Sequence, residues 1–213
     1  NTGNTLIHRI RSALLACALC TAALAASAQV KIGFIGTLSG PSAALGQDQY
    51  DGFMLAVEQR NGMLGGVPVA VVKEDDRQDP ELGAQLVENL VQKDKVSFIT
   101  GVTSSDVMMA MARPLARSGV LFVGSNAGPA PLAGRQCNNR FVFTSSQDEY
   151  QAGIAGRYAV DKGWWKTLFL APDSPSGRDQ LRGFRHFYSG EVVSELHARP
   201  DQADYSAELT KIG

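Results

Sequence analysis

Short apolar runs and segments of helical periodicity alternate along the chain. The first run spans residues 31–36 and ends at Gly36, and a segment with helical spacing of its apolar residues follows at 45–61. Further β-type runs lie at 67–72, 97–100, 120–124, 141–143, 168–171 and 191–197. Helical patterns start at Asp79 and Ser105 and span 148–162 and 177–188. Strands that alternate with amphipathic helices predict an α/β fold with a parallel sheet and right-handed crossovers.

A segment rich in glycine and proline divides this alternation into two parts. Residues 125–131 hold too many of these residues for a regular element, and the alternation restarts after residue 147. We therefore predict a lobe boundary at 144–147. The first lobe would span residues 29–145 and the second residues 146–213.

Three hydroxyl residues, Thr103, Ser104 and Ser105, follow the run at 97–100 and stand at the start of a helical pattern. Free N–H groups and the positive end of the helix dipole make such a turn a site for an anion. Serine is also a common N-cap residue. A ligand site and a plain helix cap both remain open for Ser104 and Ser105.

The N-terminal segment has the features of an export signal. His8, Arg9 and Arg11 form a basic region, residues 13–25 are apolar and alanine-rich, and Ala-Ser-Ala at 26–28 precedes Gln29. A membrane anchor needs a longer and more strongly apolar run. We expect cleavage of a signal peptide over residues 1–28 and a mature chain in the periplasm.

Composition and charge exclude several classes of partner. The chain has 213 residues, a formal net charge of −1 and 19% charged residues, which favours neither nucleic acid nor an anionic membrane. Cys137 is the one cysteine after the predicted signal, and no zinc-type Cys/His spacing occurs. The acidic run at 74–76 is typical of a solvated strand end or of a helix-capping turn. We expect no metal and no cofactor.

Two enzyme classes with similar patterns do not fit. Glycines at Gly33, Gly36 and Gly40 lack the spacing of a dinucleotide-binding fingerprint. The turn from Gly101 to Ser105 lacks the second glycine of a nucleophile elbow, and no histidine stands in a partner context. We expect no catalytic residues and a protein that is not an enzyme.

Several stretches together resemble one family, the type I periplasmic substrate-binding proteins of ABC transporters, of the branched-chain amino-acid kind. The match runs from about Val30 to the last residue, and the order and spacing of the stretches make it specific. They are Ile-Gly-Phe-Ile-Gly-Thr-Leu-Ser-Gly-Pro at 32–41, Leu-Gly-Gln-Asp at 45–48, Asp-Asp-Arg-Gln-Asp-Pro at 75–80, Ser-Asn-Ala-Gly-Pro at 125–129 and Asp-Tyr-Ser-Ala-Glu-Leu at 204–209.

The resemblance implies two doubly wound α/β lobes, joined by hinge strands, that close on a small ligand. The chain begins at Asn1 and stops inside a predicted helix, so we expect a truncated chain with an incomplete second lobe. The resemblance implies that Ser104 or Ser105 holds a ligand carboxylate, with backbone groups of Ala127 and Gly128 as a second contact.

Two further residues face the expected ligand from the second lobe. Asp148 would meet a ligand amine, and helix N-capping is the alternative. Ser176, in the turn after the run at 168–171, would approach from the other side, and an ordinary polar turn is its alternative.

Two departures leave the ligand class open. The amino-acid binders carry a hydroxyl residue at the position of Pro129, which has neither hydroxyl nor N–H, and an aromatic residue in the turn at 174–176. We therefore expect either an aliphatic amino acid or an aromatic or other organic acid, delivered to an ABC transporter membrane permease. The alternatives are the ligand-sensing domain of a receptor with the same fold and a truncated fragment without function.

Overall fold

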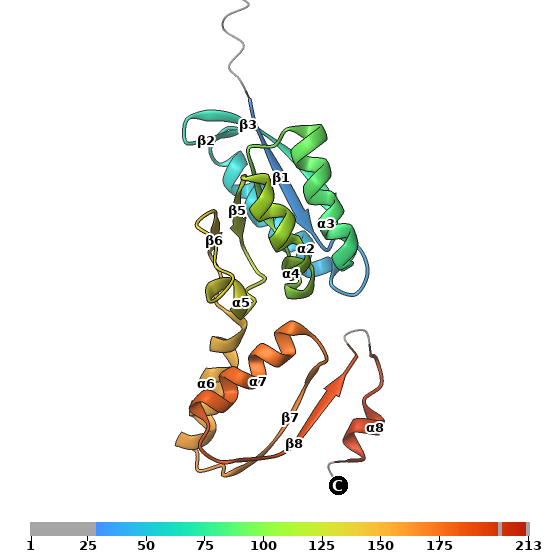
Figure 1. The fold of residues 1–213 in the computed structure, drawn as a ribbon, viewed down its shortest axis with the longest axis vertical. Helices are drawn as coiled ribbons and strands as arrows, with labels where there is room; N and C mark the ends of the chain where they lie inside the picture. The colour runs from blue at the N-terminus through green and yellow to red at the C-terminus, as the bar shows by residue number, and fades with distance from the viewer. Residues whose placement is uncertain (1–28, 200–201, 212–213) are drawn as a thin grey trace, which may run out of the picture.

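The structure is a computed structural model that describes residues 29–199 and 202–211. The predicted signal at 1–28 lies outside the described residues. The described strands form two sheets, one in each lobe (Figure 1). The larger sheet has six strands in the order β2-β3-β1-β4-β5-β6, and every pairing is parallel except β2 with β3. Its strands are β1 (Val30–Gly36), β2 (Met63–Leu64), β3 (Val67–Asp75), β4 (Phe98–Gly101), β5 (Leu121–Gly124) and β6 (Phe141–Phe143).

Helices cover both faces of this sheet. They are α2 (Ala43–Glu58), α3 (Pro80–Asn89) with a π-helical turn η1 (Leu90–Asp94), α4 (Ser105–Ser118) and the short α5 (Ala130–Ala133). Neighbouring residues of β1 point to opposite faces, as a strand requires. The Phe34 ring contacts Tyr50 and Phe53 of α2, whereas Ile35 joins the core under α3 and α4.

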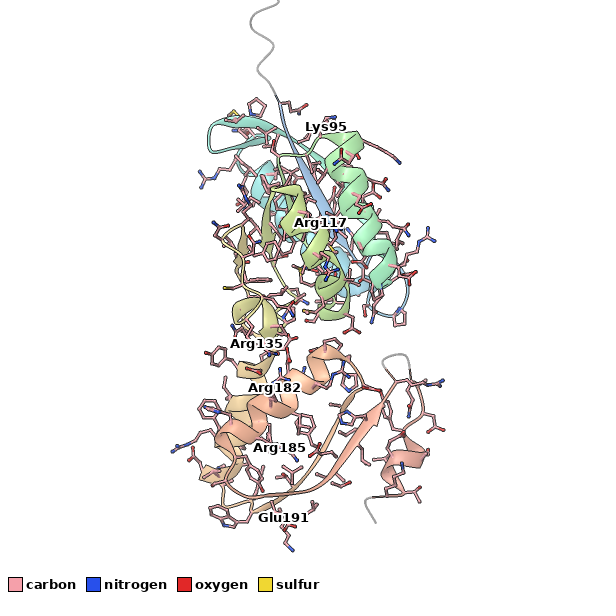
Figure 2. The ribbon with its side chains drawn as sticks, viewed as in Figure 1. Lys95, Arg117, Arg135, Arg182, Arg185 and Glu191 are labelled. Carbon is pink, nitrogen blue, oxygen red and sulfur yellow. The ribbon has the colours of Figure 1, made fainter. Side chains whose placement is uncertain are left out.

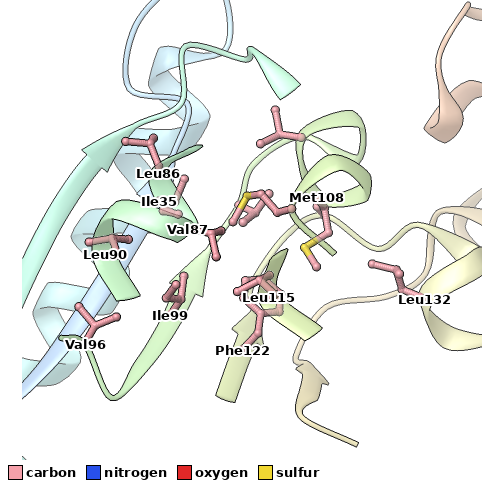
Figure 3. Close-up of a cluster of buried hydrophobic side chains, with 14 residues drawn as sticks. Ile35, Leu86, Val87, Leu90, Val96, Ile99, Met108, Leu115, Phe122 and Leu132 are labelled. Atoms are coloured by element: carbon pink, nitrogen blue, oxygen red, sulfur yellow. The ribbon is translucent and has the colours of Figure 1, made fainter. Parts of the chain in front are cut away.

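That core is the main apolar cluster of the first lobe (Figure 3). Leu86 and Leu90 from the α3 side meet Met108 and Leu115 of α4 over the central strands, and Phe122 of β5 closes the cluster. Several of these side chains are fully buried. Burying each large apolar side chain contributes about 1.5–3 kcal/mol, so this cluster holds the β4–α4 turn in place.

The second lobe pairs two parallel strands with two closely packed helices. Its elements are α6 (Asp148–Asp161), β7 (Lys166–Pro172), α7 (Pro175–Phe187), β8 (Glu191–Ala198) and α8 (Ser206–Leu209). Strands β7 and β8 pair with each other. Gly156 and Gly183 let α6 and α7 approach: a Cβ on Gly183 would stand 1.8 Å from the Glu149 carbonyl oxygen.

The sequence predicted the order of most elements, and the structure corrects four details. Helix α2 ends at Glu58 because Asn61 and Gly62 adopt positive φ angles in the following turn, and a short hairpin strand, β2, had no signal of its own. Helix α5 begins inside the segment at 125–131 that predicted no regular element. The acidic run at 74–76 is not wholly solvated, because Asp76 is 0% exposed and accepts a hydrogen bond from the Thr37 hydroxyl.

None of the helices in the described part of the chain is long and apolar enough to cross a lipid bilayer.

Candidate functional site

The candidate site lies where β4 and β5 end side by side. Gly101 pairs with Gly124, so the turn at 102–104 and the loop at 125–129 leave the same edge of the sheet. Gly101 has φ +109°, and a Cβ there would stand 2.2 Å from the Ile35 carbonyl oxygen. Val102 follows with φ +66° although it is β-branched and fully buried. Such a conformation persists only where the surroundings hold it, and it is common at binding sites.

The structure gives the two serines of this turn different contacts. Ser104 is the N-cap of α4, and its hydroxyl accepts the Asp106 N–H at 3.3 Å. Ser105 is the first helical residue, 7% exposed, and its hydroxyl donates to Asp148 Oδ2 at 2.8 Å. The capping alternative therefore applies to Ser104, while the Ser105 hydroxyl binds a carboxylate of the second lobe.

The residues that act on the Asp148 carboxylate include three that sequence analysis proposed as ligand contacts. Burial raises the pKa of Asp148 above its ordinary value of 3.8, and the Asp179 charge adds to the rise. Hydrogen bonding from the Ser105 and Ser176 hydroxyls and from the Gly128 backbone opposes it, because these groups stabilise the ionised carboxylate. The N-cap alternative for Asp148 is wrong, since Gln147 occupies that position and Asp148 begins the helix.

Backbone contacts fix the loop at 125–129. The Ala127 N–H donates to the Val102 carbonyl at 3.1 Å, and the Gly128 carbonyl accepts the Asp148 N–H at 2.9 Å. Gly128 has no room for a side chain, because a Cβ would stand 2.4 Å from the Ser146 carbonyl oxygen. The Ala127 N–H thus serves the loop itself, whereas Gly128 contacts the start of the second lobe.

A second acid of the second lobe also reaches this loop. Asp179 of α7 is 3% exposed, and its Oδ2 accepts the Ala130 N–H at 2.7 Å. Arg182 of α7 (Figure 2) bonds to the other Asp179 oxygen and to Glu149 of α6 at 2.7 Å. The loop is therefore bracketed by Asp148 and Asp179.

Sequence reasoning missed a chain of hydrogen bonds that supports the first-lobe side of the site. The Gln49 amide donates to the Ser125 hydroxyl at 2.8 Å and accepts from the Thr103 hydroxyl at 2.8 Å. The Thr103 hydroxyl in turn accepts the Thr37 N–H at 3.1 Å. Gln49 is one of several polar residues in the α2 pattern, and no local signal distinguishes it from Gln47, two positions earlier.

Carboxylates outnumber cations around the Ser105–Asp148 contact. Burial raises the pKa of Asp106, the nearby charge of Arg178 opposes the rise, and that of Asp148 adds to it. Arg178 itself pairs with Asp173 at 2.8 Å. Within residues 29–199 and 202–211, no group of three or more His, Cys, Asp or Glu side chains is arranged to hold a metal ion.

Comparison with known proteins gives consistent matches. A family model described as "Periplasmic binding protein" matches residues 29–213. The Leu/Ile/Val-binding protein BraC3 of Rhizobium johnstonii is 30% identical over 193 residues, which cover 88% of this chain and 52% of BraC3. The Leu/Ile/Val-binding protein homolog 3 of Brucella melitensis is 29% identical over 196 residues, covering 89% of this chain and 53% of that protein. The chain thus spans about half the length of the curated relatives it matches.

Solved structures agree with these matches. A solute-binding protein of an ABC transporter from R. palustris, in complex with benzoate, superposes with a TM-score of 0.83 at 26% identity, covering 86% of this chain and 52% of that one. The branched-chain amino-acid transporter substrate-binding protein LivJ of Streptococcus pneumoniae, in complex with isoleucine, superposes with a TM-score of 0.78 at 28% identity. The match covers 86% of this chain and 53% of LivJ. The expected α/β fold of two lobes is confirmed, with an incomplete second lobe relative to these proteins. The chain belongs to the periplasmic binding protein family, whose members are solute-binding proteins.

Proposed function

We propose that this protein is the extracytoplasmic solute-binding component of an ABC importer. It binds a small carboxylate-bearing molecule between its lobes and presents the closed form to a membrane permease. The export signal predicted at 1–28 would direct it to the periplasm. The mature chain would begin at Gln29.

One observation carries the proposal: the Ser105 hydroxyl already binds a carboxylate, that of Asp148, at 2.8 Å. Hydroxyl and amide donors that are held in place and partly desolvated stabilise a carboxylate without a cation. Ser105 lies at the carboxyl ends of parallel strands, where open α/β sheets bind their ligands. Benzoate and isoleucine, the ligands of the two solved relatives, both carry a carboxylate.

Closure of the two lobes around the ligand would be the binding mechanism. The β4–α4 turn, which carries Ser104 and Ser105, and the loop at 125–129 follow strands of the six-stranded sheet. Asp148 and Ser176 stand at the starts of α6 and α7, which we assign to the second lobe. A ligand that contacts both lobes stabilises the closed arrangement, and this differential affinity drives the hinge motion. No step of this mechanism needs a metal or a cofactor.

A thermal-shift screen of the full mature protein tests the proposal. One panel holds branched-chain and other aliphatic amino acids, and the other holds benzoate, hydroxybenzoates and short organic acids. A ligand that binds only the folded state raises the melting temperature by mass action. We expect a rise with members of at least one panel. A cooperative melt that no member of either panel shifts would overturn the proposal.

A further inference from the structure

One of the donors proposed for the ligand carboxylate, the Ser105 hydroxyl, is occupied by a carboxylate of the protein. Asp148 Oδ2 accepts the Ser105 hydroxyl at 2.8 Å, and the Ser176 hydroxyl and the Gly128 backbone also stabilise its ionised form. These groups come from the β4–α4 turn, from the start of α7 and from the loop at 125–129. The Ser105–Asp148 hydrogen bond therefore joins the β4–α4 turn to the start of α6.

We propose that Asp148 selects the ligand by charge type, because it competes with a ligand carboxylate for the Ser105 hydroxyl and the donors beside it. The inference rests on the proposed function and names its ligand class. A ligand that carries an ammonium group beside its carboxylate is accepted with Asp148 ionised. A ligand that carries only a carboxylate is disfavoured at neutral pH.

The reason is that two carboxylates that share one set of donors cannot both remain ionised without strong repulsion. A simple acid binds when Asp148 takes up one proton from the solvent, since the neutral carboxyl group then donates a hydrogen bond to the ligand carboxylate instead of competing with it. A zwitterion places its ammonium group against the ionised Asp148, so its binding needs no proton.

The charges that face Asp148 favour the same selection. Two cations of α7 are already engaged in ion pairs: Arg182 with Glu149 and Asp179, and Arg178 with Asp173. The negative charges of Asp106 on α4 and of Asp179 on α7 act on Asp148. The other charged groups on these helices near the site are Glu149 of α6 and Asp173, Arg178 and Arg182 of α7, which pair with one another or with Asp179. The surroundings thus add negative charge rather than a counter-ion for a second carboxylate.

Proton linkage in the unmodified full-length protein gives the first test. Calorimetric titrations with benzoate and with isoleucine are run at about pH 6 and about pH 8, each in two buffers with different ionisation enthalpies. We expect benzoate binding to take up about one proton and to weaken up to about tenfold per pH unit over this range. Isoleucine binding should take up none. Benzoate binding without proton uptake would overturn the inference.

A pair of matched variants gives the second test. Asp148→Asn keeps the size of the side chain and an oxygen for the Ser105 hydroxyl but removes the charge. Asp161→Asn, at the other end of α6, is the control, because its carboxylate is exposed and forms an ion pair with the exposed Arg157. We expect Asp148→Asn to tighten benzoate binding at pH 8 and to weaken isoleucine binding, each by about tenfold or more. The control should change neither.

The outcomes separate this inference from the proposed function. If the unmodified protein binds either probe and Asp148→Asn leaves the ratio of the two affinities unchanged, the inference fails and the proposed function stands. If a cooperatively folded unmodified protein and both variants bind no carboxylate ligand, the proposed function fails. If Asp148→Asn does not fold, the proton uptake of the unmodified protein still decides.

Discussion

The Asp179 carboxylate of α7 accepts the N–H of Ala130, the first residue of α5, at 2.7 Å. This hydrogen bond joins the second lobe to the loop that carries Ala127 and Gly128. Asp179 is 3% exposed, so water cannot replace the bond if it is lost. The position of the loop therefore depends on the second lobe as well as on the sheet that it follows.

Replacement of Asp179 should lower stability more than replacement of a similar exposed acid. Asp179→Ala leaves the Ala130 N–H without its partner and should lower the free energy of unfolding by about 1–3 kcal/mol. Asp173→Ala removes an exposed ion pair with Arg178, which is worth about 1 kcal/mol or less. Urea denaturation of both variants measures the difference. Equal losses would contradict the buried role of Asp179.

Substitution of Ser104 should mainly lower stability, whereas substitution of Ser105 should mainly weaken ligand binding. Ser104→Ala removes the N-cap of α4 and should cost about 1 kcal/mol of stability, with little change in ligand affinity. Ser105→Ala should weaken binding of a carboxylate ligand by about 1.5–3 kcal/mol, because a charge-assisted hydrogen bond is lost. Together the two substitutions should cost roughly 2 kcal/mol or more of binding. Calorimetry gives the affinities, and unchanged affinity in Ser105→Ala would remove this residue from the site.

Two glycines should respond to alanine in opposite directions. In Gly183→Ala the new Cβ would stand 1.8 Å from the Glu149 carbonyl oxygen, so α6 and α7 must separate at a cost of about 1–3 kcal/mol. Gly52 lies in α2 with open space around it, and Gly52→Ala should stabilise the protein by up to about 1 kcal/mol. Thermal melts of both variants test this pair. A Gly183→Ala protein as stable as the parent would contradict the close helix contact.

Asp76 should make stability fall as the pH rises. Burial is the main cause that raises its pKa above 3.8, and the charges of Asp75 and Asp79 add to it, while hydrogen bonds from Thr37 and Gln78 oppose it. Between the unfolded pKa and the raised folded pKa, the folded state binds more protons. The contribution of Asp76 is therefore fully present below about pH 3.8 and is lost as the pH rises through the folded pKa.

Asp76→Asn removes this titration. The stability of the variant relative to the parent should increase steadily as the pH rises through that window. Unfolding free energies measured from pH about 4 to about 7 give the comparison. Parallel pH profiles for the two proteins would show that Asp76 does not titrate differently in the folded state.

Local patterns were enough to predict most of the first lobe. Apolar runs ended by glycine correspond to β1, β4 and β5, and the Asp79-Pro80-Glu81 start was correct: the Asp79 carboxylate accepts the N–H groups of Glu81 and Leu82 at 2.8 and 3.1 Å. These signals depend on residues a few positions apart. The hairpin strand β2 and the short helix α5 were missed, because each has only two to four residues and no period can be read from them.

The candidate site was predictable in part. Hydroxyl residues after an apolar run indicated a turn that could bind an anion, and this role and the lobe boundary placed at 144–147 both stay predictions. The roles of Ser104, Ser105, Ala127, Gly128, Asp148 and Ser176 toward a ligand likewise stay predictions. The contribution of Gln49 had no sequence signal, since its partners Thr103 and Ser125 lie 54 and 76 positions away.

The sequence by itself determined the alternation of strands and helices, the helix caps and the hydroxyl turn, because propensity, periodicity and capping act between near neighbours in the chain. Only the tertiary structure decided that the Ser105 hydroxyl meets Asp148, 43 positions away, and that Asp76 is buried against Thr37, 39 positions away. Such contacts depend on which strand ends meet at one edge of the sheet and on how closely the second lobe approaches it. Burial and charge at the site arise from that packing and have no counterpart in any short segment of the chain.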